Sequence, residues 1–178
     1  LSCFPTSAEP GKEFTSVTYS NVYFREPESR ADQTRMMGIV TTGSETGYYV
    51  DVFRSRKERG GDKMHDYFYH NLGQTMTLTA ADGTDLNLQP TEELAFAGAH
   101  LYGYSYLYDK KVAATGKDVK ATFTIDMKDK GGDDIVMNLW MKGEPDREVF
   151  TALSPMTEGL SRTPGMPYNI KEQPTLTF

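Results

Sequence analysis

The chain has 178 residues, the length of one domain, and its single cysteine, Cys3, excludes an internal disulfide. With 19 Lys+Arg against 25 Asp+Glu the net charge is -6 at pH 7, and no basic stripe is present, so we expect no nucleic-acid partner. No apolar run approaches the ~20 residues that cross a bilayer, so we expect no membrane span. The opening residues carry no signal-peptide pattern.

Apolar residues recur mainly with period 2, which is the strand period. The expected strands, in chain order, are residues 14–25, 35–42, 48–54, 65–71, 74–80, 85–89, 101–110, 118–126, 135–142, 148–153 and 175–178. Turn residues separate several of them, and Asp82-Gly83 predicts a hairpin with a type I′ turn. Short strands at this spacing predict an all-β fold, an antiparallel β-sandwich.

Only residues 91–97 have a helical pattern, with Thr91 as a candidate cap, so we expect at most one short helix. The proline-rich stretch 154–173 is expected to form an irregular loop. We predict a single β-sandwich domain over residues 1–178. Because the chain opens on Leu1, we expect it to be a trimmed piece of a longer protein.

Two histidines, His65 and His70, lie five residues apart, a spacing that places them on opposite faces of a regular strand. Asp66 and Phe68 share the face of His70. His70 is either a polar strand-end residue with a backbone hydrogen bond or a functional residue such as a metal ligand.

Asp51 lies in an otherwise apolar and aromatic strand, so its carboxylate needs a partner. One alternative is an ion pair with Arg35 or Arg54. The other is a metal ligand or a carboxylate that orients a histidine.

Tyr102, Tyr104, Tyr106 and Tyr108 share one parity, so on a strand all four would project from the same face. We call this set the tyrosine ladder. It predicts either an aromatic platform on which sugar rings stack or a sheet face covered by a neighbouring segment, for which we expect the 154–173 loop.

Several stretches of the chain, taken in order, resemble the β-sandwich region of heparinase II/III-like polysaccharide lyases. The first is YVDVFR at 49–54, followed by Gly60-Gly61 and HDYFYHNLG at 65–73. The later stretches are MKGEPDREVF at 141–150 and QPTL at 173–176. The resemblance runs from about Asp32 to the end of the chain.

Enzymes of that family join an α-helical toroid to antiparallel β-sheet domains and cleave uronic-acid-containing polysaccharides by β-elimination. They use Tyr and His for proton transfer, and some bind zinc through histidines and an aspartate. The resemblance therefore implies zinc ligands at His70 and Asp51. This chain lacks the helical toroid, and no histidine precedes His65, so the family's earlier β-domain histidines are absent.

The resemblance implies that the chain is the C-terminal β-sandwich part of such a lyase. In that role it would support the cleft for an acidic polysaccharide and pack against the α-helical toroid of the parent chain. The isolated chain is then expected to be inactive, and the family works in the periplasm or outside the cell. The alternatives are a free-standing carbohydrate-binding module that uses the tyrosine ladder and a structural domain without a ligand.

Overall fold

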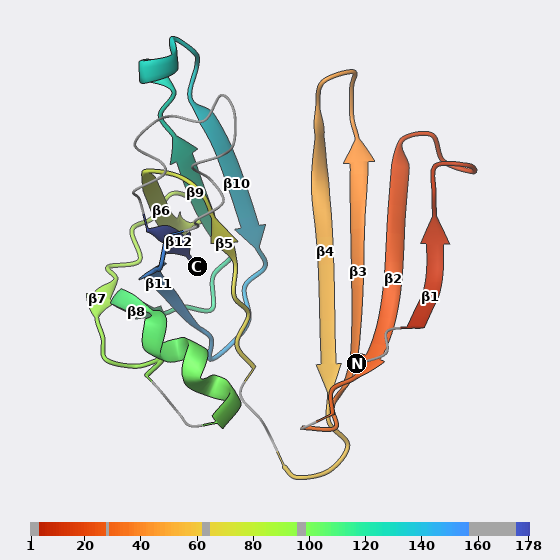
Figure 1. Cartoon of the computed structure of the whole chain (residues 1–178), viewed down its shortest axis with the longest axis horizontal. Coiled ribbons are helices and arrows are strands. Elements are labelled where there is room, and N and C mark those ends of the chain that lie inside the picture. The colour runs from red at the N-terminus through yellow and green to blue at the C-terminus, as the bar shows by residue number, and fades with distance from the viewer. Residues whose placement is uncertain (1–3, 28, 62–64, 96–98, 157–173) are drawn as a thin grey trace. The chain divides into compact units, whose positions relative to one another are not determined.

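The computed structural model describes residues 4–27, 29–61, 65–95, 99–156 and 174–178 (Figure 1). The chain divides into two compact units, Leu1–His65 and Asp66–Phe178. Nearly all regular structure is strand in antiparallel sheets, which confirms the all-β prediction. No helix in the described part of the chain is long and apolar enough to cross a membrane.

The first unit is one antiparallel sheet in which each strand pairs with the next along the chain. Its strands are β1 (Phe4–Glu9), β2 (Val17–Arg25), β3 (Asp32–Thr41) and β4 (Gly47–Arg56). The strands predicted at 14–25, 35–42 and 48–54 correspond to β2, β3 and β4, although β2 begins only at Val17. The sequence did not predict β1, because Pro5 weakens a strand pattern; β1 lies at the sheet edge, where proline is tolerated, and its register shifts between Pro5 and Ser7.

The second unit contains two antiparallel sheets (Figure 1). One has the order β10-β9-β6, with β6 at Thr75–Ala80, β9 at Val119–Ile125 and β10 at Ile135–Met141. The other has the order β5-β12-β11-β8-β7, with β5 at His70–Asn71, β12 at Thr175–Thr177, β11 at Glu148–Ser154, β8 at Tyr108–Ala114 and β7 at Gln89–Pro90.

Both sheets of the second unit contribute to one hydrophobic core, as a β-sandwich requires. The buried members of this core are Leu78, Val119, Ala121, Phe123, Val149, Leu176 and Phe178. Three of these residues, Val119, Ala121 and Phe123, occupy every second position of β9, so one face of that strand lies in the core. The two packed sheets of the sandwich therefore belong to the second unit. That residues 1–178 form a single domain stays a prediction.

Three local predictions are wrong because of the φ angles that the backbone adopts. Residues 91–95 form no helix because Leu94 adopts a φ of 54°, and residues 96 and 97 lie outside the described part of the chain. The strand expected at 85–89 is broken at Asn87, which has a φ of 54°, and only Gln89 enters β7. The chain does reverse at Asp82-Gly83, but only Gly83 has a positive φ, so the turn is not type I′.

The strand expected at 65–71 is reduced to β5. Its neighbour β12 offers only Thr175–Thr177 for pairing, and Tyr69 adds two further backbone hydrogen bonds with Phe178, of 2.8 and 2.9 Å. The residues before Tyr69 form no strand because no neighbouring strand pairs with them in the described part of the chain.

Candidate functional site

In the second unit Phe68 contacts the rings of His70 and Tyr104, and Asp66 and Thr177 form hydrogen bonds with those two residues. We call these five residues the Phe68 cluster. Its members come from the segment before β5, from β5 itself, from β12 and from the 3-10 helix η1 (Ala99–Tyr106). They are Asp66, Phe68, His70, Tyr104 and Thr177. The predicted grouping of Asp66, Phe68 and His70 is consistent with these contacts, while Tyr69 packs on the core residue Phe123.

The rings of the Phe68 cluster are in direct contact. Phe68 stacks on the His70 imidazole with centroids 6.1 Å apart and meets the Tyr104 ring edge-on at 5.4 Å. The Tyr104 hydroxyl donates a hydrogen bond to a carboxylate oxygen of Asp66. On the other side, His70 Nδ1 lies 2.9 Å from Thr177 Oγ1, so the His70 ring is oriented by a side chain of β12.

The environment of Tyr104 keeps its hydroxyl protonated. Burial raises the pKa of Tyr104 above its ordinary value of 10.0, and the hydrogen bond to Asp66 and the charge of that carboxylate raise it further. At neutral pH Tyr104 is therefore a hydrogen-bond donor, and it is poorly suited to remove a proton as a phenolate.

The raised pKa of Tyr104 gives an expected pH dependence. The unfolded chain releases the tyrosine proton near pH 10.0, whereas the folded chain still holds it, so stability falls as the pH rises above that value. We expect Tyr104→Phe to weaken this alkaline decline, as measured by urea unfolding at neutral pH and above pH 10. An unchanged decline would contradict the assignment, and Tyr108→Phe is a control because Tyr108 is exposed.

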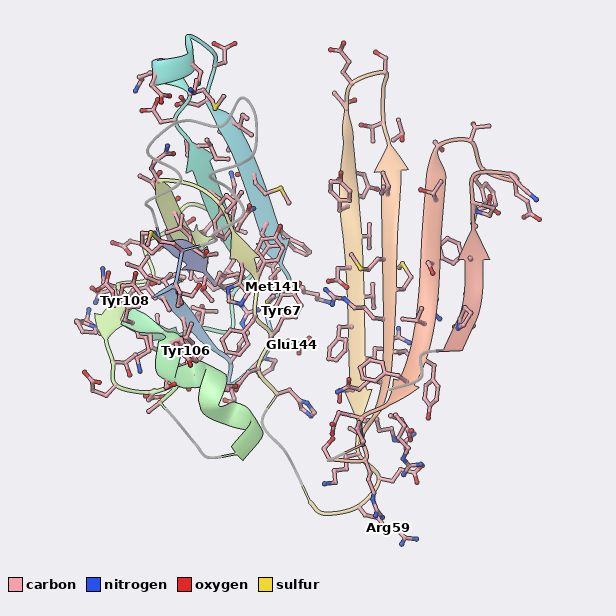
Figure 2. All side chains as sticks on the ribbon, in the orientation of Figure 1. Arg59, Tyr67, Tyr106, Tyr108, Met141 and Glu144 are labelled. Carbon is pink, nitrogen blue, oxygen red and sulfur yellow. The ribbon has the colours of Figure 1, made fainter. Side chains whose placement is uncertain are left out.

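The tyrosine ladder does not exist as predicted, because its members do not share a strand. Tyr102, Tyr104 and Tyr106 belong to η1, and only Tyr108 is in β8. Figure 2 labels Tyr106 and Tyr108 on these two elements. Successive residues of a 3-10 helix are turned by about 120°, so positions two apart do not share a face. The side chain of Tyr102 lies outside the described part of the chain, as do residues 157–173 of the loop expected to cover the ladder.

Asp51 forms the ion pair that was one of its two expected alternatives. Arg35 donates to both carboxylate oxygens of Asp51, with Nε–Oδ1 at 3.0 Å and Nη2–Oδ2 at 2.6 Å. The two residues lie on β3 and β4, diagonally across the same face of the first unit's sheet. A bidentate ion pair of this kind satisfies the hydrogen-bonding needs of the carboxylate without a metal.

The described residues contain no group of three or more His, Cys, Asp or Glu side chains that could hold a metal ion. Asp51 belongs to the first unit and His70 to the second. The zinc site with His70 and Asp51 therefore stays a prediction.

A second surface of interest is the outer face of the sheet formed by β6, β9 and β10, which we call the outer face. Residues of one parity on these strands are directed into the core, and those of the other parity form the outer face. Its members are Thr75, Thr77 and Thr79 of β6, Lys120, Thr122 and Thr124 of β9, and Val136, Asn138 and Trp140 of β10.

Comparison with known proteins adds one relationship. The chain is 32% identical over 143 residues to a protein of Formosa agariphila named "Endo-acting ulvan lyase". The chain is therefore related to a polysaccharide lyase. The matched residues make up 78% of this chain but only 17% of that protein, so the chain spans a small part of its relative. No family model matches the chain, and no solved structure matches it.

The relationship to a polysaccharide lyase supports the broad part of the sequence-based interpretation. The relative is named as a lyase of ulvan, and the resemblance to heparinase II/III-like enzymes in particular stays a prediction. The outer face was missed by that interpretation. Its members are far apart along the chain, and they form one surface only through the pairing of Thr77 with Thr122 and of Thr122 with Asn138. The available signal was the period of two in a strand, which places Asn138 and Trp140 on one side of β10.

Proposed function

We propose that this chain is the non-catalytic β-sheet part of a heparinase II/III-like polysaccharide lyase that acts on uronic-acid-containing polysaccharides. In this role it supports the substrate cleft and packs against an α-helical toroid of the same lyase. The observation that carries the proposal is the 32% identity to an ulvan lyase over 78% of this chain. The all-β fold agrees with the β-sheet region expected from the resemblance.

The Phe68 cluster supports a non-catalytic role for the isolated chain. β-Elimination needs one group to remove a proton and another to deliver one, both within reach of the sugar. In the Phe68 cluster the Tyr104 hydroxyl donates a hydrogen bond to Asp66, and the pKa of Tyr104 is raised. His70 Nδ1 forms a hydrogen bond with the Thr177 hydroxyl. The Phe68 cluster therefore does not by itself offer such a pair, and we propose that the proton-transfer groups come from another part of the lyase.

The same proposal places the protein in the periplasm or outside the cell, where polysaccharides are encountered as long chains. Within the tyrosine set, substrate contact is proposed for Tyr106 and Tyr108, whose side chains are exposed. Aromatic rings of this kind stack on the apolar faces of sugars while the hydroxyls bond to water or sugar.

The experiment that tests the proposal is a chimera. The segment of the Formosa agariphila ulvan lyase that matches this chain is replaced by this chain, and release of unsaturated uronate from ulvan is followed by ultraviolet absorbance. We expect the chimera to be active and both the isolated chain and a lyase lacking the segment to be inactive. A deletion variant with full activity would contradict a supporting role. Activity of the isolated chain on ulvan, heparan, chondroitin or alginate, lost in His70→Ala, would show that the chain is catalytic.

Zinc binding by His70 and Asp51 is part of the same proposal and has its own test. If zinc binds, calorimetric titration of the full chain is expected to show a site that His70→Ala and Asp51→Ala both remove, because zinc requires about four converging ligands. An affinity unchanged in either variant rejects the pair as ligands.

A further inference from the structure

The outer face has the composition of a surface that recognises hydroxyl-rich ligands. Five of its nine side chains are threonines, and none is acidic. Thr122 Oγ1 donates to Asn138 Oδ1 at 2.9 Å, which leaves the Asn138 amide hydrogens available as donors. Hydroxyl and amide groups on a sheet face can exchange hydrogen bonds with sugar hydroxyls, whereas a protein partner usually buries a more apolar core.

One end of the outer face combines an aromatic ring with a positive charge. Trp140 is 57% exposed and lies directly across from Lys120 of β9. Lys120 is exposed, and no carboxylate lies within ion-pair distance of its ammonium among the described residues. A large exposed tryptophan beside a free cation is suited to a ring that carries a negative substituent.

The turn that follows β10 is held in place by hydrogen bonds between side chains and backbone, and it carries a second cation. Lys142 is exposed and comes two residues after Trp140, and its carbonyl accepts a hydrogen bond from Arg147 Nη1 at 2.7 Å. Gly143 N–H donates to Asp118 Oδ1 at 2.7 Å. The acidic residues of this turn are Glu144 and Asp146. Burial lowers the pKa of the Arg147 guanidinium, and the negative charges of Glu144 and Asp118 oppose that shift.

We propose that the outer face binds an anionic polysaccharide chain, with one sugar ring stacked on Trp140 and its carboxylate or sulfate group facing Lys120. The inference rests on the proposed function, since the relationship to a polysaccharide lyase makes an acidic glycan the ligand expected here. The outer face is thus a secondary substrate site, separate from the Phe68 cluster.

Trp140 is the only tryptophan in the chain, so its fluorescence reports on this site alone. The full chain is titrated with oligosaccharides of alginate, which carry uronate without sulfate, and of carrageenan, which carry sulfate without uronate. A neutral glucan serves as the ligand control. We expect a saturable change in tryptophan emission with at least one anionic glycan, weakened by added salt because exposed charges are screened. The preferred glycan identifies the charged group that Lys120 contacts.

Variants then separate the outer face from other surfaces, with binding measured by calorimetry. We expect Trp140→Ala to weaken binding about threefold to tenfold, as the loss of one stacking contact predicts. Lys120→Gln is expected to weaken binding and reduce its salt dependence, and Lys120→Arg to retain both. Tyr49→Ala is the matched control, because Tyr49 is an aromatic residue of the first unit that is 73% exposed.

The outcomes distinguish this inference from the proposed function. If the chain binds an anionic glycan and Trp140→Ala and Lys120→Gln leave the affinity unchanged, the outer face is not the site, although the proposed function stands. If the chain binds none of the glycans while the chimera with the ulvan lyase is active, the inference is again wrong and the proposed function stands. An inactive chimera contradicts the proposed function, whatever the glycan titration shows.

Discussion

Phe123→Ala is expected to lower the free energy of unfolding of the second unit by about 3–5 kcal/mol, which is the cost of removing a buried aromatic side chain. Phe123 is 1% exposed, lies on the central strand β9 and contacts the Tyr69 ring at 5.7 Å. Its loss would leave a cavity between the two sheets of the sandwich. Urea unfolding followed by Trp140 fluorescence measures the effect, because that residue belongs to the second unit.

The control for this prediction is Phe14→Ala, since Phe14 is 58% exposed in the first unit. We expect it to change stability by less than about 0.5 kcal/mol, as exposed substitutions usually do. Equal effects of the two substitutions would show that the core described around β9 does not stabilise the fold.

Gly143→Ala is the second substitution with a large expected effect, because a Cβ at this position meets backbone on the neighbouring turn. The added atom would lie 2.2 Å from the Gly116 carbonyl oxygen and 2.7 Å from the Lys117 carbonyl carbon. Neither atom belongs to a flexible side chain, so one turn must move. The move would disturb the Gly143–Asp118 hydrogen bond and the two Arg147 hydrogen bonds to backbone, for a cost of about 3 kcal/mol.

Gly103→Ala is the matched glycine control, since a Cβ at Gly103 has no atom within 4 Å. Thermal unfolding of both variants tests the prediction, and a Gly143→Ala midpoint equal to that of the control would contradict it. Because the same turn carries Lys142, we also expect Gly143→Ala to weaken glycan binding at the outer face.

The parts of the fold that the sequence predicts well are those in which alternation is strong and unbroken. β9 is the example, because apolar and polar residues alternate along its full length and its apolar face enters the core. The alternation of tyrosines at 102–108 was equally regular and gave the wrong element. There the hydrogen bond of Tyr104 to Asp66 and its packing on Phe68 accompany a 3-10 helix instead, and such contacts between distant segments leave no local pattern.

Among the candidate sites, too, the sequence predicts some contacts and not others. The ion pair of Arg35 and Asp51 could be predicted, because a lone carboxylate on an apolar strand needs a nearby cation. The juxtaposition of Trp140 and Lys120 could not, because it depends on the register between two strands joined by a connection of nine residues, 126–134. A shift of that register by one residue would place Lys120 opposite a core-facing position.

The central position of β9 also determines how the backbone of the second unit opens to solvent. β9 is hydrogen-bonded on both sides, by β6 and β10, and its core-facing residues Val119, Ala121 and Phe123 are almost completely buried. Its amide protons can exchange with deuterium only when the sandwich itself unfolds. The outward edge of β4 has no paired strand in the described part of the chain, so the amides on that edge exchange without any unfolding.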